Sequence, residues 1–266
     1  MRDFSLHIYR VLLEAFQWKG YRFITFADYC KYYSKAEERQ HEKYVILRHD
    51  VDRHPQNALR MAQVERSQRA KGTYYFRVGK ESNNPDVIRT IAALGNEIGY
   101  HYEDMHLCKG RIDQAWEHFK LWLGYFRVFY PVETICMHGV PLSPYDGREL
   151  WKKYDYHQPG IIGEPYLDTD FNDVLYLTDT GRCWDGFKIA VRDKIDERQA
   201  EWCRKGWVYH STKDLIRALE NDQLPPHIML NTHPQRWTNH KFYWWRELIW
   251  QNAKNCVKWI LTRRKK

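Results

Sequence analysis

The feature that most constrains the fold is a regular alternation of short apolar segments with longer amphipathic ones between residues 44 and 232. The apolar segments predict strands, and the segments between them carry proline near their starts and glycine near their ends, as helices do. Hairpin signals are few, so consecutive strands are expected to run parallel with a helix between them. We therefore expect an α/β fold: an irregular (β/α) barrel of about seven parallel strands with extra helices at both termini.

The expected elements follow from this alternation. The expected strands span 23–26, 44–52, 73–78, 97–102, 134–138, 161–167, 174–178, 207–210 and 228–232. The expected helices span 4–18, 27–34, 55–71, 84–95, 112–129, 148–154, 211–220 and 242–261. No linker or internal repeat interrupts them. Residues 1–266 are expected to form a single domain, with 1–43 as an N-terminal helical extension and 241–266 as a C-terminal helix.

Composition limits the compartments and the partners that are expected for this chain. No apolar run has the length of a membrane span, the first residues lack the apolar core of a signal peptide, and the six cysteines are scattered, so a reduced, cytoplasmic protein is expected. The net charge of +8 invites a nucleic-acid interpretation, but no nucleic-acid module is present and none is expected as a partner. The basic C-terminal helix, with Lys254, Lys258 and 263–266, allows at most peripheral contact with a membrane.

Side chains that suit a metal stand at the ends of several expected strands. Asp50 and Asp52 close the strand at 44–52, and alternation along a strand places both carboxylates on the same face, about 7 Å apart. Two buried carboxylates need a metal, a proton or a cation to compensate them. In a parallel barrel the active site lies at the carboxyl ends of the strands. Later expected strands end in His101, His138, Asp179 and His233.

These residue types suit metal-assisted hydrolysis. Asp and His ligands with an open coordination position suit a divalent metal such as zinc, which lowers the pKa of a bound water to about 7. A second carboxylate beside that water can accept its proton, and a histidine across the pocket can protonate the leaving group. A metal also polarises a carbonyl group. The sequence therefore predicts an enzyme that hydrolyses an amide or an ester.

Five motifs make the chain resemble the polysaccharide deacetylase superfamily, also called the NodB-homology or carbohydrate esterase family 4 group. Within it, the chain is most similar to a divergent branch associated with O-antigen or capsule biosynthesis. The resemblance runs from about residue 44 to residue 237 and implies a deacetylase barrel acting on an acylated sugar or polysaccharide precursor. The motifs are His-Asp-Val-Asp (49–52), Glu-Ile-Gly-Tyr-His-Tyr-Glu (97–103), His-Gly-Val-Pro-Leu-Ser (138–143), Thr-Asp-Thr-Gly (178–181) and Thr-His-Pro-Gln-Arg-Trp (232–237).

The resemblance also implies roles for four residues by their positions in these motifs. Asp50 would be the catalytic base and His233 the catalytic acid. Asp52 and His101 would be metal ligands. In the family's pattern a second metal histidine stands four residues after the first, where this chain has Met105.

That departure leaves the third metal ligand open. His106 is favoured over His138 because it is closer to His101 in the sequence. The family's Arg-x-Pro motif is also replaced, by His138-Gly139-Val140-Pro141, so the support for the base is expected to differ. Residues expected to contact the substrate are His138, Asp179, Arg236 and Trp237.

Simpler interpretations of the same residues stay open. Asp50 and Asp52 are also consistent with a pair neutralised by Arg48 and Arg53, and His101 with a buried histidine bonded to the backbone. At the level of function, one alternative is a non-catalytic carbohydrate-binding barrel with a degraded metal site. The other takes Asp50-Val51-Asp52 as the Asp-x-Asp motif of a metal-dependent glycosyltransferase.

Overall fold

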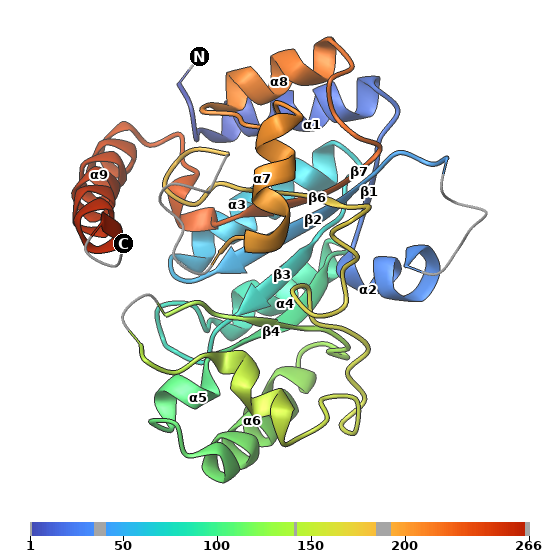
Figure 1. Cartoon of the computed structure of the whole chain (residues 1–266). Helices are drawn as coiled ribbons and strands as arrows, with labels where there is room; N and C mark the ends of the chain where they lie inside the picture. Colours follow the sequence, from blue (N-terminus) through green and yellow to red (C-terminus); the bar gives the residue numbers. More distant parts are fainter. Residues whose placement is uncertain (1, 35–40, 141–142, 185–192, 264–266) are drawn as a thin grey trace.

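A curled, all-parallel sheet organises the molecule (Figure 1). The computed structural model describes residues 2–34, 41–140, 143–184 and 193–263, with side chains up to residue 252. The strands lie in the order β5–β4–β3–β2–β7–β6, and β1 also pairs with β2. This half-barrel confirms the predicted α/β class and is consistent with an irregular barrel. The strands are β1 (Arg22–Ile24), β2 (Tyr44–Val51), β3 (Thr73–Phe76), β4 (Glu97–Tyr102), β5 (Ile135–Met137), β6 (Leu175–Thr178) and β7 (His227–Thr232).

Helices connect the strands, and side-chain caps fix several helix starts. Ser5, Asn84 and Ser211 each accept a hydrogen bond from a backbone N–H in the first turn of the following helix, which satisfies a donor that the helix itself leaves unpaired. The α-helices are α1 (Leu6–Trp18), α2 (Phe26–Asp28), α3 (Pro55–Ser67), α4 (Pro85–Ala93), α5 (Asp104–Leu107), α6 (Ile112–Arg127), α7 (Asp196–Arg204), α8 (Thr212–Glu220) and α9 (Lys241–Arg263). A π-helix (Tyr29–Tyr33) and two 3-10 helices, η3 (Gly147–Lys152) and η4 (Pro234–Arg236), complete the described elements.

Two apolar clusters cover the two halves of the sheet. One joins α1 and α8, which lie together at the top of Figure 1, to β1, β2, β6 and β7. The other joins α4 and α6 to β3, β4 and β5. Every residue of β2 is buried, as expected for a central parallel strand covered on both faces.

Strand β2 is the hub of the sheet. Its register with β7 runs from Tyr44 opposite His227 to His49 opposite Thr232. Along its other edge, β1 pairs with the first half of β2, from Tyr44 to Ile46, and β3 pairs with the second half, from Arg48 to Val51. The carboxyl end of β2 therefore lies between the ends of β3 and β7. Asp50 and Asp52 stand at this end of the strand.

Two predicted strands do not form. The segment 161–167 makes a single bridge, between Thr134 and Gly163, rather than a strand. The carboxylate of Glu164 accepts from the backbone N–H groups of Met137, Tyr166 and Leu167, so a side chain replaces the ladder there. Pro165 has no N–H to give to a ladder.

The other predicted strand that does not form, 207–210, is irregular because its backbone groups make hydrogen bonds outside the sheet. The N–H of Trp207 donates to Trp202, and the carbonyl of Tyr209 accepts from Trp184. Helix α7 was not predicted. The predicted helix at 148–154 is the 3-10 helix η3, and that at 27–34 is a turn of α-helix followed by the π-helix.

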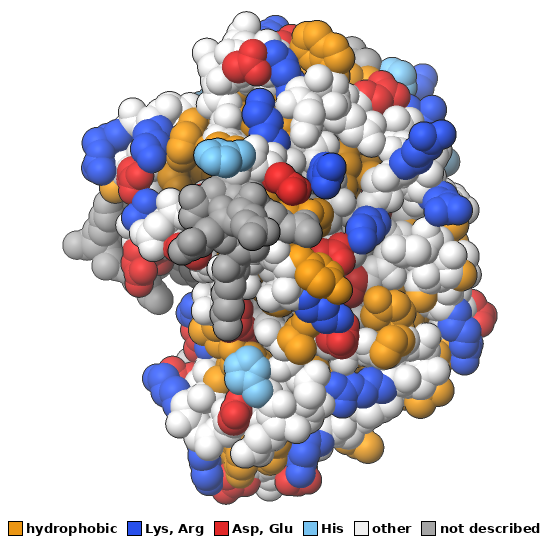
Figure 2. All heavy atoms as spheres, turned by 90° about the vertical axis from the view of Figure 1, so that its right-hand side faces the viewer, with side chains coloured by type: hydrophobic (Ala, Val, Ile, Leu, Met, Phe, Trp, Pro, Cys, Tyr) orange, Lys and Arg blue, Asp and Glu red, His pale blue; other side chains and the backbone are white. Residues whose placement is uncertain are grey.

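The surface carries mixed charge on the face drawn in Figure 2, where Lys and Arg side chains are interspersed with acidic, polar and hydrophobic ones. Among the described residues, no helix combines the length and the apolar character needed to cross a bilayer. Parts of the sequence predictions lie outside the described residues: Pro141 and Leu142 of the 138–143 motif, the side chains of Lys254 and Lys258, and residues 264–266.

Candidate metal centre

Side chains from three strand ends converge on one carboxylate oxygen. Asp52 follows β2, His101 lies in β4 and His138 follows β5. The Oδ1 atom of Asp52 is 3.6 Å from His101 Nε2 and 3.0 Å from His138 Nδ1. The two histidine nitrogens are 3.2 Å apart. One ligand atom from each residue lies within 4.8 Å of the others, so the three form a group that could hold a metal ion.

The protonation of His101 favours such a role. Its Nδ1 atom is 2.9 Å from the backbone carbonyl oxygen of Cys136. A carbonyl oxygen only accepts, so Nδ1 carries a proton, and Nε2 is the ring nitrogen that faces Asp52. Metal-binding histidines commonly donate their other ring N–H to a backbone carbonyl in this way. The backbone bond expected for a purely structural histidine is thus present, and it leaves Nε2 available.

Asp52 has one oxygen that the protein itself does not satisfy. Its Oδ2 accepts from Gln235 Nε2 at 2.9 Å, whereas Oδ1 is buried and makes no hydrogen bond of good geometry with any described residue. Burial acts to raise the pKa of Asp52, but the imidazoles of His138 and His101 lower it well below its usual range. An ionised, buried oxygen flanked by two imidazoles is well suited to a cation.

Asp50 is compensated differently, by an arginine from its own strand. Arg48 donates from Nε and Nη2 to the two carboxylate oxygens at 2.9 and 2.7 Å, and Asn231 Nδ2 donates at 3.1 Å. Burial acts to raise the pKa of Asp50, but the guanidinium of Arg48 outweighs it and the pKa is lowered. Asp50 is therefore a fixed, ionised carboxylate whose Oδ2 lies 3.8 Å from His101 Nε2. Pairing with Arg48, one of the simpler interpretations, applies to Asp50, whereas Asp52 is compensated by imidazoles.

A second group of possible ligands overlaps the first. Asp50, His101 and Cys136 also bring one ligand atom each within 4.8 Å of the others. Burial raises the pKa of the Cys136 thiol well above its ordinary value, and a metal requires the thiolate. Asp50 is already engaged by Arg48. The group around Asp52 is therefore the better candidate.

A histidine held by an aspartate faces the opposite side of Asp52. His233 follows β7, and its Nδ1 lies 2.7 Å from Oδ1 of Asp179, which follows β6. The backbone N–H of His233 donates to the other oxygen of Asp179 at 2.9 Å. His233 Nε2 lies 4.0 Å from Asp52 Oδ2. These bonds aim Nε2 of His233 toward the candidate centre.

Charges around His233 favour its protonated form. Burial and the charge of Arg236 act to lower the pKa of His233, but Asp179 and Asp52 outweigh them and the pKa is raised. For Asp179, burial acts to raise the pKa, but Arg236 and His233 lower it. Arg236 and Trp237, which were expected to contact substrate, both donate to Asp179, the latter at 2.7 Å, and both are buried. They hold the Asp179 carboxylate in place.

The structure places His106 away from these residues. Met105 turns into the apolar cluster under α5, and the next position, His106, is exposed, with Nδ1 3.0 Å from Ser143 Oγ. Within the described residues, His106 belongs to neither group of possible metal ligands. The structure brings His138, and not His106, to Asp52 and His101.

Sequence reasoning missed Asp193. The carboxylate of this half-buried residue accepts hydrogen bonds from the hydroxyls of Tyr166, Tyr176, Thr178 and Thr180. Burial acts to raise the pKa of Asp193, but the charges of His233 and Arg48 and the threonine hydroxyls lower it. No motif surrounds it; the one available signal was the pair of hydroxyls two residues apart at the end of β6.

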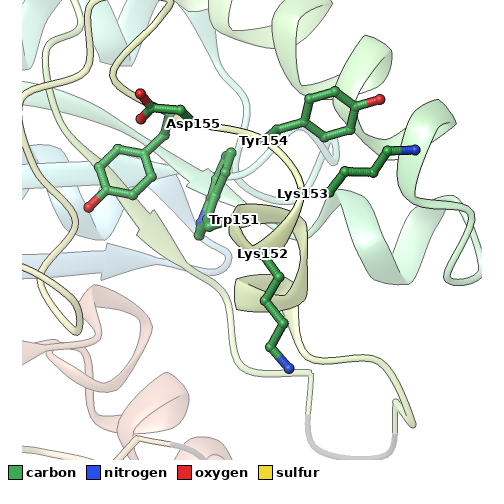
Figure 3. Close-up of a pocket in the computed structure, with 6 residues that line it drawn as sticks. Trp151, Lys152, Lys153, Tyr154 and Asp155 are labelled. Atoms are coloured by element: carbon green, nitrogen blue, oxygen red, sulfur yellow. The ribbon is translucent and has the colours of Figure 1, made fainter.

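A surface recess lies elsewhere on the molecule. It measures about 340 Å³ and is lined by the six residues from Trp151 to Tyr156. In Figure 3 the side chains of Lys152 and Lys153 extend away from Trp151. None of the lining residues belongs to the groups of possible metal ligands.

Comparison with protein-family models, curated proteins and solved structures finds no match for this chain. The functional argument therefore depends on the geometry of the candidate metal centre and on its chemistry.

Proposed function

We propose that this protein is a metal-dependent hydrolase that removes an acyl group, an N- or O-acetyl, from a sugar in surface-polysaccharide biosynthesis. The observation that carries the proposal is the convergence of Asp52, His101 and His138 at three strand ends, beside a fixed Asp50 and an oriented His233. The motif resemblance to the polysaccharide deacetylase superfamily supports the substrate class.

Two imidazole nitrogens and one carboxylate oxygen suit zinc, with His138 in the position of the third ligand. When bound, such an ion would lower the pKa of a water and polarise the acyl carbonyl. Asp50, kept ionised and oriented by Arg48, is placed to accept the proton of the attacking water. Arg48 thereby supplies the support that the missing Arg-x-Pro motif supplies in the family's pattern.

His233 completes the scheme as the acid. Its raised pKa favours the protonated ring, and its bond through Nδ1 to Asp179 leaves Nε2 to donate to the leaving nitrogen or oxygen. A glycosyltransferase is less well supported, because the bidentate bond to Arg48 leaves Asp50-Val51-Asp52 with one available carboxylate instead of two.

The decisive experiment combines metal analysis with an assay of acetate release. The purified protein, loaded with zinc, is given N-acetylated and O-acetylated sugars and oligosaccharides. We expect stoichiometric zinc, release of acetate, and a fall of at least about 100-fold in kcat for Asp52→Ala. An Asp52→Ala variant that releases acetate at the wild-type rate would refute the proposal. Zinc-free protein that binds the sugars and releases nothing would instead favour a carbohydrate-binding barrel.

A further inference from the structure

Helix α9 exposes an unusual concentration of large apolar side chains. Five of the eleven large hydrophobic residues that are exposed in the described part of the chain lie between residues 242 and 250. The others are scattered singly, which is ordinary for a protein surface. The five are Phe242, Tyr243, Trp245, Ile249 and Trp250, with exposed fractions of 65, 49, 56, 66 and 53%.

The opposite side of α9 is the side that holds the helix to the protein. Trp244 and Gln251, seven residues apart, are both buried. Trp244 Nε1 donates to the backbone carbonyl of Asp3 at 2.7 Å, and the guanidinium of Arg182 lies 5.0 Å from the Trp244 ring. The helix is thus anchored by one face. Its outer face carries apolar residues at the helical spacing i, i+3, i+7: Phe242, Trp245 and Ile249.

The described charged side chains beside this apolar stripe are mainly basic. Lys241 and Arg246 are exposed, and the guanidinium of Arg246 lies 5.0 Å from the ring of Tyr243. Residues 241–266 contain eight Lys and Arg and one acidic residue, Glu247. A second copy of this chain docked on the stripe would bring two such basic sets together, which is unfavourable. A surface of anionic headgroups complements them.

The residue types of α9 also suit a surface of anionic headgroups. Helices that lie in a membrane interface carry Trp, Phe and other large apolar residues on one face and Lys and Arg around it. Aromatic rings with a polar edge favour the boundary between acyl chains and headgroups. We propose that α9 docks this protein on an anionic lipid surface, with Phe242, Trp245 and Ile249 in that boundary and Lys241 and Arg246 against the headgroups.

Helix α9 also lies on the same edge of the sheet as the candidate metal centre. It follows η4, which comes directly after His233 at the end of β7, and it is the helix at the left of Figure 1. The charges of Arg246 and Glu247 lie close enough to His54, in the loop after β2, to act on its pKa. Lipid docking does not depend on the proposed hydrolase activity and is tested without it.

The test is sedimentation of the full chain with vesicles of phosphatidylcholine alone or mixed with phosphatidylglycerol. We expect binding to the mixed vesicles that weakens with salt, and little binding to the neutral ones. Replacing the exposed pair in the variant W245S/I249S should weaken binding by about tenfold or more. The variant K241Q/R246Q should weaken it by about fivefold per charge removed.

The matched control is L121S/V128S. It removes two apolar side chains from the α6 region that are 69 and 74% exposed, and it should leave binding unchanged. Equal binding to neutral and anionic vesicles, no binding to either, or wild-type binding by W245S/I249S would each overturn the proposal. Sedimentation velocity provides the remaining check: a dimer that W245S/I249S abolishes would assign the stripe to a second copy and also overturn it.

Discussion

Three aspartates at neighbouring strand ends are each kept ionised by a different partner. Asp50 is paired with Arg48, Asp52 with the imidazoles of His101 and His138, and Asp179 with Arg236 and His233. Only Asp52 retains a buried oxygen without a hydrogen bond among the described residues. These single contacts give three chemically identical side chains three different roles in the proposed mechanism.

The choice of the third metal ligand gives a direct test. We expect His138→Ala to lower zinc affinity by about 100-fold or more, because it removes a nitrogen beside Asp52, whereas His106→Ala should change it by less than about twofold. Competition with a chromophoric chelator measures both. Loss of zinc in His106→Ala with retention in His138→Ala would return the ligand role to His106.

The pairing of His233 with Asp179 predicts a pH dependence. The folded-state pKa of His233 is raised, so the stability that its charged form contributes is fully present below its unfolded pKa of about 6.5 and is lost as pH rises through the folded value. Replacing Asp179 by Asn removes the negative charge responsible. We expect the pKa of His233 to fall in NMR titration, and the basic limb of the pH–rate profile to move to lower pH.

Asp173→Asn is the matched control for that titration. Asp173 bonds a different histidine, His227, at 2.7 Å. This variant should leave the titration of His233 where it is in the wild type. A pKa of His233 that does not respond to Asp179→Asn contradicts the assignment of the proton.

At the residue scale, the sequence predicted the site residues that stand at strand ends and missed a residue whose partners lie in separate segments. Asp50, Asp52 and His101 could be placed together because strand ends of a parallel sheet meet at one edge. Asp193 could not, since its partners come from separate segments that no spacing connects. The nearness of His138 to Asp52 depends in the same way on how β5 lies beside β4.

Among the elements, helices whose start carries a proline or a capping side chain were predicted well. Helices α3, α4 and α8 begin at Pro55, Pro85 and Thr212, close to the predicted starts. Helix α7 escaped prediction because, of its nine residues, only Gln199 and Trp202 are buried, which gives little apolar periodicity. The segment 161–167 has the apolar content of a strand, but a glutamate side chain takes over its backbone bonding.

The surroundings of two glycines predict opposite effects of an alanine substitution. A Cβ atom at Gly99 would clash with the ring of Tyr75 and would lie 3.0 Å from the carbonyl oxygen of Thr134. We expect Gly99→Ala to lower the free energy of unfolding by about 1–3 kcal/mol. Gly124, in α6, has nothing within 4 Å of such an atom, so Gly124→Ala should raise it by up to about 1 kcal/mol.

Urea denaturation of both variants measures these changes, with an unchanged m-value showing that only stability differs. A Gly99→Ala protein as stable as the wild type would mean that β3 and β4 can separate without cost, contrary to the packing seen here.

For the whole molecule, an ion at the candidate centre should couple to folding. A ligand that binds only the folded state stabilises it by about 2.7 kcal/mol at 100 times its Kd. For a chain of this size that corresponds to a rise in Tm of about 5–10 °C. We expect zinc to raise the calorimetric Tm by this amount, a chelator to reverse the rise, and Asp52→Ala to abolish it. A rise that persists in Asp52→Ala would place the ion elsewhere.

The pairing of β2 with β7 has a consequence for biosynthesis. A ribosome adds roughly 5–20 residues per second, so Tyr44 waits about 10–40 s before its partner His227 is made. Through that interval one edge of a strand that is entirely buried in the folded protein lacks its neighbour, and nascent chains halted before β7 will expose the apolar residues Val45, Ile46 and Leu47 to aggregation. Holdase chaperones that bind the exposed segment during translation would limit this aggregation.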